Sequence, residues 1–159
     1  MMTQDAIGIR GKVVIEVFDP GNELVSRTVA FNTVVDGGRA LIAKLMSGEA
    51  KEPSFAIVAG ISEKENSPDL TELYEPDGIE PLRVERVKSD SGNVVLSGSF
   101  KEADKDRQIR EAGLELICLV DGTEFKTLYN RVRLKEATPV RKGQVLSMNW
   151  MLSFAQATE

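Results

Sequence analysis

The chain has 159 residues, which favours one domain that is large enough to bury a hydrophobic core. Its 20 basic and 25 acidic side chains give a net charge of −5, which disfavours non-specific binding to DNA or to an anionic membrane surface. A single cysteine excludes an intrachain disulfide, and no apolar run approaches the roughly 18 residues of a membrane span. We therefore expect a soluble product of the cytoplasm, with one β-rich domain over residues 1–159, a flexible N-terminus at 1–8 and a flexible C-terminal tail at 155–159.

The first predicted elements form a β-hairpin. Residues 11–18 and 23–35 are rich in β-branched side chains, which favour strands. The sequence DPGN at 19–22 is typical of a tight turn, and we expect Gly21 to supply the positive φ. Alternation places three apolar residues on one side of the second strand, namely Val25, Val29 and Phe31.

A helix is predicted within residues 32–48, directly after this hairpin. Asp36 is the expected N-cap, and Gly48 suits the left-handed residue that ends a helix. We expect the helix to cover one face or end of a β-structure with an apolar stripe made of Leu41, Ile42, Leu45 and Met46.

The remaining chain alternates between strand patterns and turn sequences. Residues 62–81 form the longest weakly structured segment, with a possible helical turn at 68–74, and are the leading place for a partner contact. Further strands are predicted at 53–61, 81–88, 93–101, 109–120, 125–135 and 145–154. The pattern predicts a mainly β fold, an antiparallel β-sandwich or partly open barrel of seven or eight strands with one α-helix after the first hairpin.

Two of these strands have predicted faces. In 125–135, alternation puts Leu128, Asn130, Val132 and Leu134 opposite Tyr129, Arg131 and Arg133. In 145–154, the side predicted to face the core consists of Leu146, Met148, Trp150, Leu152 and Phe154.

Few residues suggest chemistry. The absence of histidine removes the commonest general base and metal ligand, and Cys118 lies in an apolar strand, which favours a buried core thiol. The Asp36-Gly37-Gly38 turn before the helix could hold a phosphate, or it could only serve the strand-to-helix turn. We assign no catalytic, cofactor-binding or metal-ligating residue, and no partner-binding residue is identified.

Two charged clusters each allow two interpretations. Glu102, Asp104 and Asp106 could gather a hard cation or form a solvated hairpin end, and the nearby bases favour the second. A basic group near Tyr129 has the composition of a nucleic-acid strand, but alternation favours a solvated strand face for most of it. Its members are Arg131, Arg133, Lys135, Arg141 and Lys142.

Several short segments together resemble tail-associated structural proteins of phages and phage-derived particles, of the tail-fibre or baseplate type. They are NTVVDGGRALIAKLMSG (32–48), AIVAG (56–60), LTELYEP (70–76), REAGLEL (110–116), LYNRVRL (128–134) and MNWMLSF (148–154). The resemblance implies a non-enzymatic structural subunit that is incorporated into a phage-like particle and contacts other tail or baseplate proteins. The exposed strand edges expected of this fold favour homo-oligomers. The acidic net charge argues against nucleic acid and membrane as partners. The first hairpin, residues 11–31, is longer than the pattern requires.

Two other functions remain open from the residues. A carbohydrate- or peptide-binding sandwich would use the 62–81 loop with Tyr74 and Tyr129. An enzyme that works with carboxylates alone would need two acids that converge in a cleft.

Overall fold

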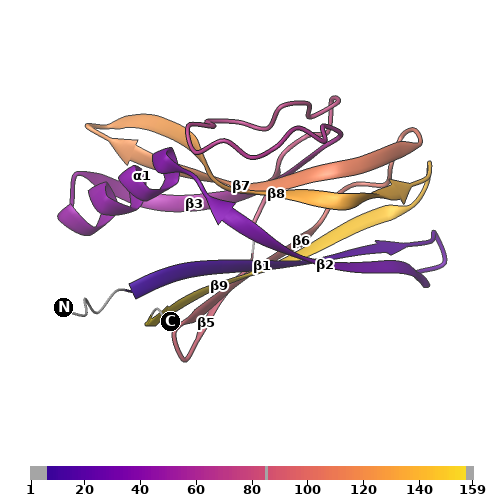
Figure 1. Cartoon of the computed structure of the whole chain (residues 1–159), viewed down its shortest axis with the longest axis horizontal. Coiled ribbons are helices and arrows are strands. Elements are labelled where there is room, and N and C mark those ends of the chain that lie inside the picture. Colours follow the sequence, from indigo (N-terminus) through magenta and orange to yellow (C-terminus); the bar gives the residue numbers. More distant parts are fainter. Residues whose placement is uncertain (1–6, 85, 157–159) are drawn as a thin grey trace.

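The computed structural model describes residues 7–84 and 86–156, which form nine strands and one helix (Figure 1). Their bounds are β1 Ile7–Phe18, β2 Leu24–Val34, α1 Asp36–Ser47, β3 Ala50–Gly60, β4 Leu82–Arg83, β5 Arg86–Asp90, β6 Asn93–Ser99, β7 Arg107–Val120, β8 Thr123–Val140 and β9 Val145–Gln156. The expected mainly β fold with one helix after the first hairpin is confirmed.

All strand pairs are antiparallel, and the strands follow one another in the order β4-β3-β7-β8-β2-β1-β9-β6-β5. The sheet curls into two layers, with β3, β7, β8 and α1 in one and β1, β2, β9, β6 and β5 in the other (Figure 1). Strand pairing connects the two layers at the end of β2. Among the described residues, Thr33 and Val34 are the only ones of β2 that pair with β8. The described strands outnumber the prediction because segment 81–88 divides into β4, which pairs with β3, and β5, which pairs with β6.

The core fills the space between the layers. The predicted inner face of β9 is confirmed for its described side chains, which are fully or almost fully buried: Leu146, Met148, Trp150 and Leu152. The prediction for Phe154 concerns a side chain outside the described part of the chain. From β1, Val13, Ile15 and Val17 meet them in the same cluster.

The helix α1 closes one end of the core, as expected, but two details of its prediction are wrong. Val35 is the N-cap, with no side-chain capping bond, and Asp36 is already helical and pairs with Arg39. Met46 is 86% exposed, because the helix rests on Leu41 and the core reaches only as far as Ile42 and Leu45. Gly48 ends the helix at φ 84°, as predicted.

The tight turns use positive φ at the residues that their geometry requires. In the first hairpin this residue is Asn22 (φ 65°), and the assignment to Gly21 is wrong; asparagine tolerates the left-handed region better than most residues. Two-residue turns at Ser91-Gly92 and Asp121-Gly122 have positive φ at both positions, which matches the twist of a hairpin.

The predicted faces of β8 hold for Val132 and Leu134 but are wrong at Leu128 and Tyr129, because the strand contains an irregularity there. Leu114 pairs with Asn130 and Glu115 pairs with Leu128, so that Tyr129 is an extra residue. Leu128 therefore packs on the outer side of this layer, while Tyr129, Val132 and Leu134 point into the main core.

The ends of the described chain lie together, because Ile7 in β1 pairs with Gln156 in β9. The flexible tails were predicted at 1–8 and 155–159. Residues 7–8 and 155–156 belong to these strands, and the rest of both tails lies outside the described residues.

Candidate functional site

The 62–81 segment crosses the outer side of β7 and β8, where a buried ion pair holds it. Glu111 in β7 and Arg131 in β8 are both 0% exposed, with 3.6 Å between Arg131 Nε and Glu111 Oε1. The Glu111 carboxylate accepts from the backbone N–H of Ser62 (3.0 Å) and of Tyr74 (2.9 Å). One side chain therefore fixes two points of the segment that are twelve residues apart.

Arg131 completes the attachment from the neighbouring strand. Its Nη1 donates to the Lys64 carbonyl (2.8 Å) and to Asn66 Oδ1 (2.7 Å), and its Nη2 donates to the Ser62 carbonyl (3.4 Å). The guanidinium also lies 4.8 Å from the centre of the Tyr74 ring. The prediction that Arg131 belongs to a solvated basic face is wrong, because the segment covers it.

Apolar contacts support the same attachment. Leu73 is buried against Val58 and Leu128, with Leu70 packed beside them. Gly60 is needed below the segment, because a Cβ there would lie 2.6 Å from the Glu75 carbonyl oxygen. The segment predicted to contact a partner is thus packed into its own domain, and no helical turn is formed at 68–74.

Neither tyrosine of the carbohydrate- or peptide-binding alternative offers an open ring. Arg131 lies over one face of Tyr74, and the Tyr74 hydroxyl donates to the Glu65 carbonyl (3.1 Å). Tyr129 is fully buried, and its burial raises its pKa to about 12. Both rings serve the fold.

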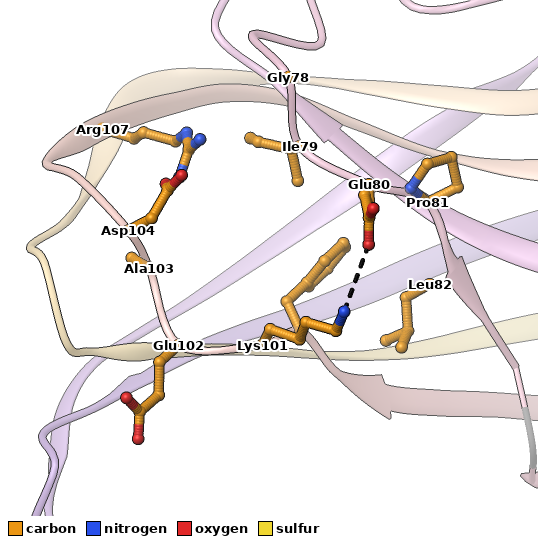
Figure 2. Close-up of a pocket in the computed structure, with 11 residues that line it drawn as sticks. Gly78, Ile79, Glu80, Pro81, Leu82, Lys101, Glu102, Ala103, Asp104 and Arg107 are labelled. Carbon is orange, nitrogen blue, oxygen red and sulfur yellow. Dashed lines mark ion pairs between the residues drawn. The ribbon is translucent and has the colours of Figure 1, made fainter.

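A pocket of about 380 Å³ lies between residues 78–82 and 100–104 (Figure 2). Four of its charged lining residues form two ion pairs: Lys101 lies 3.5 Å from Glu80, and Arg107 lies 2.7 Å from Asp104. Arg107 also lies 3.6 Å from Asp77, next to the pocket. The hydrogen bond and the charge of Arg107 lower the pKa of Asp104, so this carboxylate stays ionised at neutral pH. The pairs join the two segments that form the rim.

The three acidic residues that were predicted as a cluster lie beside this pocket and do not converge. Asp104 pairs with Arg107, and Asp106 accepts from the Lys142 backbone N–H at 2.9 Å. Glu102 lies on the pocket rim and points away from Asp104 (Figure 2). In the described part of the chain, no three side chains of metal-ligating type come together.

The candidate phosphate turn is occupied by the protein itself. The Asp36 N–H donates to the Pro68 carbonyl (2.7 Å), which uses a donor that an anion would need. Gly38 is required by close packing, since a Cβ there would lie 2.6 Å from the Tyr129 carbonyl oxygen. These observations favour the strand-to-helix interpretation.

Cys118 is buried in the core, as predicted for a strand thiol. Burial raises its pKa, so the thiol stays protonated at neutral pH.

The most exposed apolar group on a strand lies on β2. Val25 (50% exposed), Val29 (41%) and Phe31 (75%) point away from the core, and we call these three side chains the β2 surface. Sequence alternation placed them on one side, but could not tell that this side faces outward. Met151 on β9 extends the group, because it pairs with Lys12, which in turn pairs with Phe31.

Comparisons with models of known protein families, with curated proteins and with solved structures found no match. No helix in the described residues is long and apolar enough to cross a membrane.

Proposed function

We propose that this chain is a non-enzymatic structural subunit of a phage-like tail particle, which acts through contacts with other tail or baseplate proteins and with copies of itself. The observation that carries the proposal is the β2 surface. Val25, Val29 and Phe31 form an outward row that is apolar except at Arg27, on a strand whose other side faces the core. Exposed apolar rows of this kind are typical of surfaces that another protein covers.

The packing of the 62–81 segment supports the same role. Glu111 and Arg131 hold the segment against the domain, which leaves a rigid body whose surface geometry is defined before assembly. Rigid subunits bind with a smaller loss of conformational entropy than flexible ones. The segments that resemble tail-associated proteins are the reason why we propose a phage-like tail as the particle.

The experiment is to fractionate cells that produce the chain, sediment large particles and detect the chain with a specific antibody. The proposal predicts a constant ratio of this chain to the other proteins of the sedimented particle, and a gold-labelled antibody located on a tail in electron micrographs. A chain found only in the unsedimented fraction, under conditions in which tails form, would contradict the proposal.

A further inference from the structure

The edge of β2 that faces away from β1 is open. In the described part of the chain, Leu24 and residues 26–32 of β2 pair only with β1, Val25 is the extra residue of a bulge between them, and β8 joins at Thr33 and Val34. We infer that this open edge pairs with the same edge of a second copy of the chain, across a two-fold axis at Thr28. The inference rests on the proposed function and names the partner and register of the β2 surface.

This edge lacks the usual protection of an exposed strand. Monomeric proteins protect edges with proline, several charges or covering segments. Residues 24–32 contain no proline and one charged residue, Arg27, which is opposite Glu16 in β1. A carboxylate thus lies beside the single charge of this edge, which lessens the repulsion between two such edges.

The register follows from symmetry. A two-fold axis perpendicular to the sheet keeps the outer faces of the two strands on the same side. One residue of β2 then lies directly opposite the same residue of the other copy, and the axis passes between the two. With the axis at Thr28, residues 24–32 of one copy align with residues 32–24 of the other, and the whole open edge is used. Alternative axes are worse: an axis at Arg27 places two guanidinium groups opposite each other, and an axis at Val29 requires Val34, which already pairs with β8.

The side chains that meet in this register suit each other. Val25 of one copy lies opposite Phe31 of the other, and this pair occurs twice. Arg27 lies opposite Val29, and the two Thr28 side chains meet at the axis. Aromatic with β-branched pairs and threonine pairs are among the favourable cross-strand combinations. Phe31, the most exposed residue of the β2 surface, is thereby partly covered by Val25 of the other copy.

The size of the contact sets the expected behaviour. A single pair of short strand edges buries an area at the low end of specific interfaces. We therefore expect a dimer that dissociates on dilution in the isolated protein.

The test uses disulfide trapping of the purified full chain, in which the native Cys118 is buried. Two variants, Val25→Cys and Phe31→Cys, are prepared with tags of different mass and oxidised separately and as a mixture. In the inferred register, residue 25 is opposite residue 31 of the partner but about 20 Å from residue 25 of the partner, which exceeds the span of a disulfide. We expect at least about tenfold more mixed disulfide than either variant forms with itself, because only the mixed pair has suitable geometry.

A Val87→Cys variant mixed with Val25→Cys measures random collision, because Val87 is an exposed residue of β5, which β1, β9 and β6 separate from β2. Equal yields in the self, mixed and collision reactions would overturn the inference, as would a protein that stays monomeric at high concentration in light scattering. Particle association of the uncrosslinked chain is a separate measurement. If trapping fails while the chain still sediments in tails, the inferred dimer is wrong and the proposed function stands.

Discussion

Removal of the Glu111 carboxylate is the sharpest test of how the 62–81 segment is held. The change is Glu111→Ala, which leaves Arg131 buried without its counter-charge and leaves the N–H groups of Ser62 and Tyr74 without their acceptor. Loss of one partner of a buried ion pair typically costs about 3–5 kcal/mol. Since a domain of this size has a total stability of roughly 5–15 kcal/mol, the variant should be measurably destabilised and still allow study at low temperature.

The matched control is Glu115→Ala on the same strand. Glu115 also points to the outer side of β7, but its partner Lys126 is 56% exposed and lies 3.8 Å away. Pairs that involve an exposed side chain contribute about 0–1 kcal/mol, so the control should cost distinctly less than Glu111→Ala.

Urea unfolding gives the two free energies, and amide hydrogen exchange locates the effect. We expect faster exchange at Ser62 and Tyr74 in Glu111→Ala, and parental exchange at both amides in Glu115→Ala. An Arg131→Ala variant completes a double-mutant cycle, in which the double variant should be less destabilised than the sum of the single changes by about 1 kcal/mol or more. Equal costs for the two glutamate variants, with unchanged exchange, would refute the assigned role of Glu111.

Two further predictions concern the contact between α1 and β8. Gly38→Ala should lower the free energy of unfolding by about 1–3 kcal/mol, because the added Cβ meets backbone at 2.6 Å, whereas Gly21→Ala, with no atom within 4 Å, should not; urea unfolding checks both. The second concerns Tyr129, whose pKa of about 12 in the folded protein lies above the value near 10 of an unfolded chain. The protonated Tyr129 hydroxyl therefore contributes roughly 2–3 kcal/mol to the free energy of unfolding. This contribution is fully present below about pH 10 and is lost as the pH rises to about 12. Tyr129→Phe should remove this part of the alkaline destabilisation, and unchanged pH dependence in that variant would contradict the assignment.

Local sequence predicts the hairpins of this fold well, because turn chemistry and alternation act over a few residues. Asp121-Gly122 marks the β7–β8 turn, and Gly48 marks the end of α1. The buried inner face of β9 also follows from period-two alternation alone.

The proposed contact surface and the packing of the 62–81 segment depend on contacts between distant segments, which the alternation of a single strand does not reveal. The irregularity at Tyr129 changes the faces of β8, and Arg131 becomes buried only because residues 62–81 cross it. Alternation along β2 places Val29 and Phe31 on the same side of the strand. It does not tell which side of β2 the second layer covers. Each of these features depends on how distant segments pack together.

The central claim, that the β2 surface makes the assembly contact, is tested most directly by the incorporation of two lysine variants into particles. Phe31→Lys changes the most exposed residue of the β2 surface, and Phe125→Lys changes a phenylalanine that is 50% exposed elsewhere. Burial of a phenylalanine side chain contributes about 1.5–3 kcal/mol, so its loss should weaken the contact roughly ten- to hundredfold. We predict that Phe31→Lys remains folded but is lost from sedimented particles, while Phe125→Lys is retained; equal incorporation of both variants would contradict the claim.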